Sequence, residues 1–215
     1  MKSIISLLLL LGMGTRIVLA QQDPQATTIL NGVSATYKAY NSVQATFNLK
    51  VENAQDVQKD NQYGVLAVSG KKFKVSMTNQ DIICNGGTIW TYFKSENSVT
   101  IDDYEPDENS ITPSQIFTIW EKNFKYQFVE EKTENGVVVQ VIDLTPVDTK
   151  KTYFKVRLTI NKSLKSLVSA RIFDKNGNKY TYTVSTFLAN PVLGDSFFNF
   201  NAADHPGVTI TDNRG

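Results

Sequence analysis

The stretch from Asp81 to Thr100 constrains the fold more than any other part of the sequence. It contains two short apolar runs, residues 82–84 and 88–93, which are joined by Asn85-Gly86-Gly87. Because Asn and Gly both tolerate positive φ, this pattern predicts a β-hairpin. Trp90 and Tyr92 fall on one face of the second predicted strand, and large side chains also occupy its other face. Such a strand is either central to a core or lines an apolar cavity.

The rest of the chain repeats this β pattern. Residues 42–51 alternate strictly between apolar and polar side chains, which is typical of a half-buried strand. Further strands are predicted over residues 62–69, 73–77, 98–103, 125–129, 137–144, 153–160, 167–173 and 179–187, with short extended pieces at 197–200 and 208–211. We therefore expect one domain of about eleven to thirteen antiparallel strands that closes, or nearly closes, into a barrel.

Two helical segments interrupt the strands. Asp23-Pro24 has the N-cap and first-turn residues of a helix start, and apolar residues recur at helical spacing from Ile29 to Tyr40. A second start at Ser110–Pro113 precedes a segment that is apolar over most of its circumference. The pattern alone leaves open whether this second segment is an ordinary core helix or a lid over an apolar cavity.

Residues 1–20 have the composition of a cleavable signal peptide. Lys2 forms a short positive region, residues 4–11 are apolar but too few to span a bilayer, and Val18-Leu19-Ala20 fits the cleavage pattern. We expect export and a mature domain of residues 21–215. No cysteine follows the cleavage site, so the mature chain lacks the residue that is lipidated in bacterial lipoproteins and is expected to be free and soluble.

The residues that carry enzyme chemistry are scarce. His205 is the single histidine, and neither a nucleophile elbow nor a phosphate-binding glycine loop occurs. A zinc site needs more His or Cys than the chain holds, and Cys84 lies in an apolar run as a buried hydrophobe would. The formal charge is +1 without a basic stripe, so nucleic-acid binding is not expected. Carboxylates are numerous enough for a glycosidase, but we expect no catalytic residue, no metal and no cofactor.

An ordered set of segments points to a known family. The segments are Ile29-Leu30 with Val33, Ser42-Val43-Gln44-Ala45-Thr46-Phe47, Gly64-Val65-Leu66, Lys72-Phe73-Lys74-Val75, Gly86-Gly87-Thr88-Ile89-Trp90-Thr91-Tyr92, Leu144-Thr145-Pro146, Phe198-Asn199-Phe200 and Pro206-Gly207-Val208. In this order they resemble the periplasmic outer-membrane lipoprotein carrier protein family, LolA. The resemblance covers essentially the whole mature chain.

The resemblance implies both a fold and a function. The fold would be an incomplete, unclosed antiparallel β-barrel of about eleven strands with a short helical lid. The chain would be a monomer in the periplasm, and its apolar concave face would bind the acyl chains of lipoproteins. An inner-membrane ABC transporter of the LolCDE type would release this cargo to it, and a LolB-like or unknown acceptor at the outer membrane would receive it.

The resemblance also assigns site residues. The expected lining of the lipid-binding cavity is Val43, Ala45, Phe47, Phe73, Val75, Met77, Trp90 and Tyr92. The expected lid residues are Leu30, Val33, Ile116, Phe117, Ile119 and Trp120. For each residue alone, ordinary core packing is an equally good interpretation.

One departure from the family pattern affects the lid. Better-studied members carry an Arg just before the third strand that bonds the lid and holds the empty form shut. Here that segment reads Ser69-Gly70-Lys71-Lys72, and Lys lacks the planar fork of Arg. Two other functions stay open: a LolA-like module that binds lipid or senses the envelope without sorting lipoproteins, and, ranked last, a secreted carbohydrate hydrolase.

Overall fold

In the computed structural model, which describes residues 22–106 and 117–215, the chain folds around a single curved sheet. The strands are β1 (Val43–Glu52), β2 (Gln58–Ser69), β3 (Lys72–Met77), β4 (Gln80–Cys84), β5 (Thr88–Phe93), β6 (Ser98–Asp103), β7 (Phe124–Glu134), β8 (Val137–Pro146), β9 (Tyr153–Asn161), β10 (Ser166–Asp174), β11 (Lys179–Ala189) and β12 (Thr209–Asp212). The predicted strands are confirmed, and β2 and β7 are longer than their patterns indicated.

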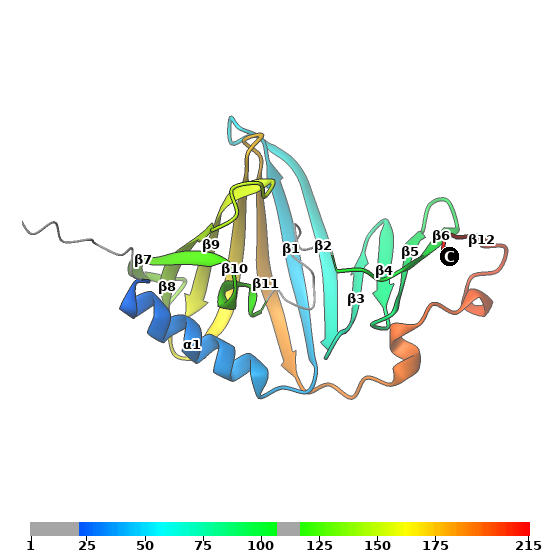
Figure 1. Cartoon of the computed structure of the whole chain (residues 1–215), viewed down its shortest axis with the longest axis horizontal. Coiled ribbons are helices and arrows are strands. Elements are labelled where there is room, and N and C mark those ends of the chain that lie inside the picture. The colour runs from blue at the N-terminus through cyan, green and yellow to red at the C-terminus, as the bar shows by residue number, and fades with distance from the viewer. Residues whose placement is uncertain (1–21, 107–116) are drawn as a thin grey trace, which may run out of the picture.

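The sheet is open. Its spatial order is β12-β6-β5-β4-β3-β2-β1-β11-β10-β9-β8-β7, so β12 and β7 are its two edges among the described residues. Figure 1 shows that the half from β7 to β11 curls strongly, whereas β3 to β6 continue as a flatter wing. The expected fold, an incomplete barrel, is therefore confirmed.

Sequence-distant strands meet at the centre of the sheet. β1 pairs with β2 along one side and with β11 along the other, so that Phe47 lies opposite both Gly64 and Val184. A register shift between Thr46 and Phe47 marks a bulge in the β1–β11 pairing. Bulges increase local twist, which fits their position where the sheet turns from its flat wing into its curled half.

One detail of the predicted topology is wrong. All neighbouring strands were expected to be antiparallel, but β12 pairs in parallel with β6, Thr209 lying opposite Ser98. The chain reaches this position by crossing one face of the β3–β6 wing, shown by the red segment in Figure 1. On the way it forms two short 3-10 helices, η3 (Asp195–Phe198) and η4 (Ala202–Asp204), which replace the extended piece predicted at 197–200.

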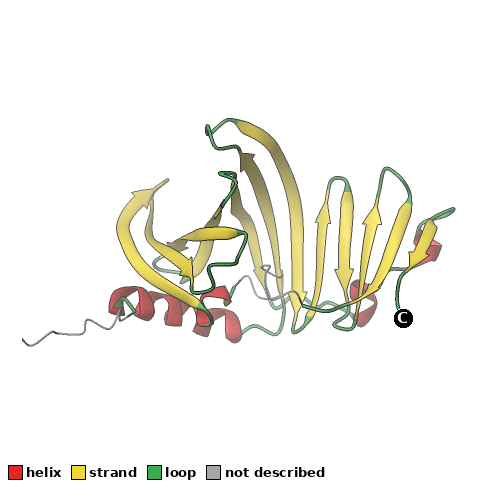
Figure 2. Cartoon of the chain, turned by 45° about the horizontal axis from the view of Figure 1, so that its top comes forward, coloured by secondary structure: helices red, strands yellow, loops and turns green. Residues whose placement is uncertain are grey.

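Helix α1 (Pro24–Lys38) covers the concave face of the curled half, as Figure 2 shows. It buries Leu30 and Val33 in the same apolar core cluster as Ile142 of β8 and Leu158 of β9. The helix begins as predicted, because Asp23 Oδ1 accepts hydrogen bonds from the backbone N–H groups of residues 25 and 26. The predicted second helix lies partly in 107–116, outside the described residues, and its end is the 3-10 helix η2 (Ile119–Glu121).

Asp23 also fixes the helix to the edge of the sheet. Its Oδ2 accepts a hydrogen bond from the N–H of Phe128 at 2.9 Å, while the side-chain amide of Gln22 bonds the carbonyl of Phe124 and the N–H of Tyr126. These groups belong to the outer edge of β7. The hydrogen bond from Phe128, followed by that from Ala26, lowers the pKa of the Asp23 carboxyl from its ordinary value.

We expect Asp23→Asn to weaken the fold in a pH-dependent way. Asn retains the N-cap but offers an N–H₂ group where Oδ2 accepts from Phe128. Because the folded pKa of Asp23 is lowered, its stabilisation is complete above the ordinary value of 3.8 and is lost as the pH falls through the folded value. Urea unfolding midpoints of the two proteins should therefore differ at pH 7 and converge at low pH. A constant difference at all pH values would contradict this account.

Candidate functional site

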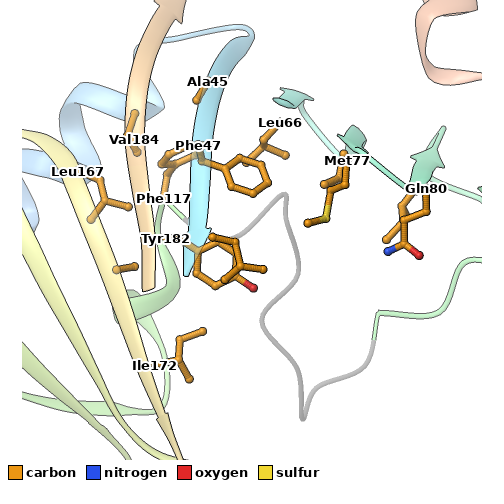
Figure 3. Close-up of a pocket in the computed structure, with 14 residues that line it drawn as sticks. Ala45, Phe47, Leu66, Met77, Gln80, Phe117, Leu167, Ile172, Tyr182 and Val184 are labelled. Atoms are coloured by element: carbon orange, nitrogen blue, oxygen red, sulfur yellow. The ribbon is translucent and has the colours of Figure 1, made fainter. Parts of the chain in front are cut away.

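An apolar cavity of about 330 Å³ lies on the concave face of the sheet, and Phe117 forms part of its lining. We call the short segment that contains Phe117, residues 117–121, the cover. Figure 3 shows its walls, which come from strands β1 to β4 on one side and from β10 and β11 on the other. The lining residues are Ala45, Phe47, Leu49, Leu66, Val75, Met77, Gln80, Ile82, Phe117, Leu167, Ala170, Ile172, Tyr182 and Val184. Twelve of these fourteen are apolar and none is charged, so the cavity suits hydrocarbon and disfavours ions.

Strand register explains why these side chains share one space. Ala45, Leu66, Val75 and Ile82 are successive cross-strand partners from β1 to β4, and side chains of partners lie on the same face. Tyr182 and Val184 continue the face on β11, where they oppose Leu49 and Phe47. The cavity is thus the uncovered part of one continuous apolar surface.

The Phe47 ring occupies space that only a glycine leaves free. Gly64 lies opposite Phe47 on β2, and a Cβ added there would overlap the ring. Gly64 is not a bulge, because the β1–β2 register shifts elsewhere, between Val51 and Glu52. Its function in the fold is to seat a lining side chain of the cavity.

The cover over this end of the sheet is held to α1. Phe117 stacks on Tyr37 with ring centroids 4.4 Å apart, and the indole N–H of Trp120 donates a 2.9 Å hydrogen bond to the buried Ser34 hydroxyl. Lys38 forms a 2.6 Å ion pair with Glu121 and holds the pKa of that carboxyl below its usual range. An aromatic stack, a buried hydrogen bond and an ion pair therefore attach this short segment to α1, in addition to the burial of Phe117 and Trp120.

Tyr37 connects the cover to the sheet. Its hydroxyl oxygen accepts a 3.0 Å hydrogen bond from the N–H of Leu167 in β10. Burial raises the pKa of Tyr37 to about 12, so the phenol stays neutral at physiological pH. A second cavity of about 260 Å³ lies beside Tyr37, and Phe117 lines both cavities.

The structure brings five of the predicted site residues together around the cavity: Ala45, Phe47, Val75, Met77 and Phe117. Val43 lines the smaller neighbouring cavity, and Phe73 is packed into the core at 2% exposure. Of the predicted lid residues, Leu30, Val33 and Trp120 are buried in the core, and Ile119 packs against it. Ile116 lies outside the described residues.

The predicted concave position of Trp90 and Tyr92 is corrected. Ile82 lines the cavity and pairs with Thr91, so the neighbours of Thr91 along β5 point to the opposite face. There Tyr92 packs on Phe200 and His205 of the C-terminal segment, at centroid distances of 5.5 and 4.2 Å. The large side chains on both faces of β5 therefore serve two different apolar layers.

Among the described residues, the segment that replaces the family Arg forms no hydrogen bond or ion pair with the cover. Lys72 forms a 2.6 Å ion pair with Asp195 of the C-terminal segment. The cover instead contacts α1 through Ser34, Tyr37 and Lys38, and Phe117 also packs edge-on against Phe187 of β11.

Sequence reasoning missed the wall made by β10 and β11. Ala170 and Ile172 alternate along one strand, as Tyr182 and Val184 do along the next, so part of the signal that indicated β1 was present here too. Leu167 is three residues before Ala170 and shares the face because the β10 register shifts between Leu167 and Ser169. What the pattern lacked was the pairing of β11 with β1, which lie about 140 residues apart.

The comparisons with known proteins agree with this geometry. The family model described as "Outer membrane lipoprotein carrier protein LolA" matches residues 38–201. The chain belongs to the LolA family. None of the curated proteins matches it in sequence.

Solved structures show the same fold as this LolA-family chain. An uncharacterised conserved protein from Thermus thermophilus has a TM-score of 0.59 at 11% identity, with 88% of this chain and 99% of that one covered. The lipoprotein LppX from Mycobacterium tuberculosis has a TM-score of 0.51 at 14% identity, with 80% and 98% covered. At these identities the likeness is one of fold. Within the described residues, no helix of this chain is both long and apolar enough to cross a bilayer.

We expect Gly64→Ala to destabilise the protein by about 1–3 kcal/mol, the usual cost of overpacking. The new methyl group displaces the Phe47 ring, which has Tyr182 as its neighbour at 5.9 Å. Chemical denaturation measures the effect. Gly87→Ala is the matched control, because its nearest neighbouring atom would be 3.9 Å from the added Cβ. Equal stabilities of the two variants would refute the steric explanation.

Ser34→Ala tests the attachment of the cover. The substitution leaves the buried Trp120 indole N–H without its acceptor, which costs about 1–3 kcal/mol. Guanidinium unfolding should show this loss, whereas Ser95→Ala in an exposed turn should leave the midpoint unchanged. If both variants unfold at the wild-type midpoint, the Trp120–Ser34 bond does not hold the cover.

Proposed function

We propose that this chain is a periplasmic carrier that binds the acyl chains of lipoproteins and transfers them from the inner to the outer membrane. The observation that carries the proposal is the uncharged, largely apolar cavity on the concave face of an open sheet. Its volume of about 330 Å³ is at the lower end of the range for ligand pockets. Family membership supplies the class of cargo.

The energetics favour such a role. Exposing one CH₂ group to water costs about 0.8 kcal/mol, so an acyl chain cannot leave a membrane for an aqueous space without a protein surface to cover it. A cavity that offers apolar contacts without charged groups provides that surface with little specificity for the attached protein. Binding and release form no covalent bond, and the proposed role requires no catalytic group.

The cover fits a carrier because apolar contacts hold it, and an acyl chain can replace contacts of this kind. The Lys38–Glu121 ion pair is largely exposed and contributes little, so the burial of Phe117 and Trp120, together with the Trp120–Ser34 hydrogen bond, holds most of the closed form. An entering acyl chain that displaces Phe117 gains apolar contacts in exchange. Opening therefore needs no external energy source at the carrier itself.

The proposed route has a donor and an acceptor. An inner-membrane ABC transporter of the LolCDE type would supply the released lipoprotein, and an outer-membrane acceptor would take it. Export by the signal peptide at residues 1–20 would place the chain between them. The alternative is a module that binds lipid for sensing and does not deliver it. The delivery experiment distinguishes this alternative from a carrier.

Val184→Glu should abolish binding of acyl chains. The substitution places a carboxylate in the cavity wall, where its burial opposes hydrocarbon binding. Thr183→Glu is the matched control, because its side chain is exposed on the opposite face of the same strand. Organic extraction of each protein purified from periplasm, followed by mass spectrometry, reports the bound lipid. Equal lipid content in both variants would contradict the proposed site.

Delivery is tested with inner-membrane vesicles that contain the transporter. The wild-type chain and Thr183→Glu should release a radiolabelled lipoprotein into the supernatant after centrifugation, and Val184→Glu should not. If the wild-type chain retains lipid on purification but releases no lipoprotein, the carrier role is wrong and the sensing alternative stands.

A further inference from the structure

Two polar side chains stand out in the cavity wall, Tyr182 on β11 and Gln80 on β4. All other described residues that line the cavity are apolar, so among them these two side chains are the places where a ligand meets a polar group. Figure 3 shows them on opposite sides of the cavity. Buried polar groups usually have a hydrogen-bond partner. Because the neighbouring lining residues are apolar and cannot serve as that partner, a ligand is the natural source of one.

Tyr182 presents a free hydroxyl. Its ring packs against Phe47 with centroids 5.9 Å apart, but its hydroxyl makes no hydrogen bond in the described part of the chain. Burial raises the pKa of Tyr182, so the hydroxyl keeps its proton at physiological pH and is available as a donor.

Gln80 is similarly available. It is half-buried at the start of β4, and its side-chain amide takes no part in the hydrogen bonds among the described residues. An amide offers two donors and one acceptor, so Gln80 can bind a carbonyl oxygen without introducing charge.

Strand register places both polar groups at the same end of the cavity. Ile82 pairs with Val75, so Gln80, two residues earlier, lies at the level of Met77. Met77 is opposite Gly64, which is opposite Phe47, and Tyr182 lies one step farther along β11 in the same direction. The other end is formed by wholly apolar residues, among them Leu66, Phe117 and Leu167. The cavity therefore has a polar end and an apolar end.

We propose that Tyr182 and Gln80 bind the ester carbonyls of a diacylated lipoprotein and so fix its acyl chains with their methyl ends toward Phe117 and Leu167. This inference rests on the proposed function and names the part of the ligand that is recognised. A diacylglyceryl group carries two ester carbonyls, one for each wall. A free fatty acid fits less well, because the described residues that line the cavity include no Lys or Arg to pair with its carboxylate.

The experiment compares two synthetic lipopeptides that differ only at the linkage. One carries a dipalmitoylglyceryl cysteine with ester bonds, and the other carries the same alkyl chains through ether bonds, which lack both carbonyl oxygens. The wild-type chain, freed of lipid, should bind the ester probe about fivefold or more tightly than the ether probe, as expected for one or two neutral hydrogen bonds. Fluorescence anisotropy of a labelled peptide measures both dissociation constants.

Two variants assign the preference to the side chains. Tyr182→Phe and Gln80→Leu should each weaken binding of the ester probe about two- to tenfold and leave binding of the ether probe unchanged. Tyr63→Phe and Gln58→Leu are the matched controls, since both residues are exposed outside the cavity. Tyr182→Phe keeps the ring that packs on Phe47, so the variant should fold.

The outcomes separate this inference from the proposed function. Equal affinities of the wild-type chain for both probes would overturn the inference and leave acyl binding intact. Binding of neither probe would overturn the proposed function, and the inference with it. Phospholipids are the other source of acyl esters, and a diester and a diether phosphatidylcholine test them in the same way. If the chain prefers the ester form of phosphatidylcholine but not the ester form of the lipopeptide, the assignment to lipoproteins is wrong.

Discussion

An open sheet with an apolar concave face must cover that face with something. In a closed barrel, the opposite wall would supply the cover, but here β7 and β12 are separate edges of one sheet. The chain fills the curled half with α1 and the segment around Phe117 and Trp120. Between β4 and β10, the described residues line the cavity without filling it. The cavity is thus a direct consequence of a sheet that bends without closing.

Helix α1 and the cover are held to the sheet in different ways. Helix α1 is fixed at both ends, by Asp23 on β7 and by Tyr37 on β10, and it buries a full apolar stripe. The segment from Phe117 to Glu121 touches α1 through single contacts at Ser34, Tyr37 and Lys38. The same segment buries Phe117 and Trp120 in the apolar core, so burial holds it as well. The helix therefore serves as the frame against which this short segment packs.

The sequence predicted the strands and the first helix because alternation and helical spacing are local signals. It did not predict which face of β5 meets the cavity, because a C-terminal segment covers the other face and makes both faces apolar. Trp90 and Tyr92 were therefore placed on the wrong side. The wall formed by Ile172 and Tyr182 was missed because it depends on the pairing of β11 with a strand far away in the chain. Local pattern gives the elements, and long-range register selects the site.

Both edges of the sheet are partly protected against pairing with other copies of the chain. Exposed edge strands offer unpaired N–H and C=O groups to other copies of a chain. Here the side chains of Gln22 and Asp23 occupy such groups on β7, and β12 runs alongside β6 as a parallel edge strand four residues long. Short and capped edges of this kind discourage strand-by-strand stacking between molecules. Pairing with another copy of the chain is thereby restricted to the rest of the β7 edge and to the short β12 edge.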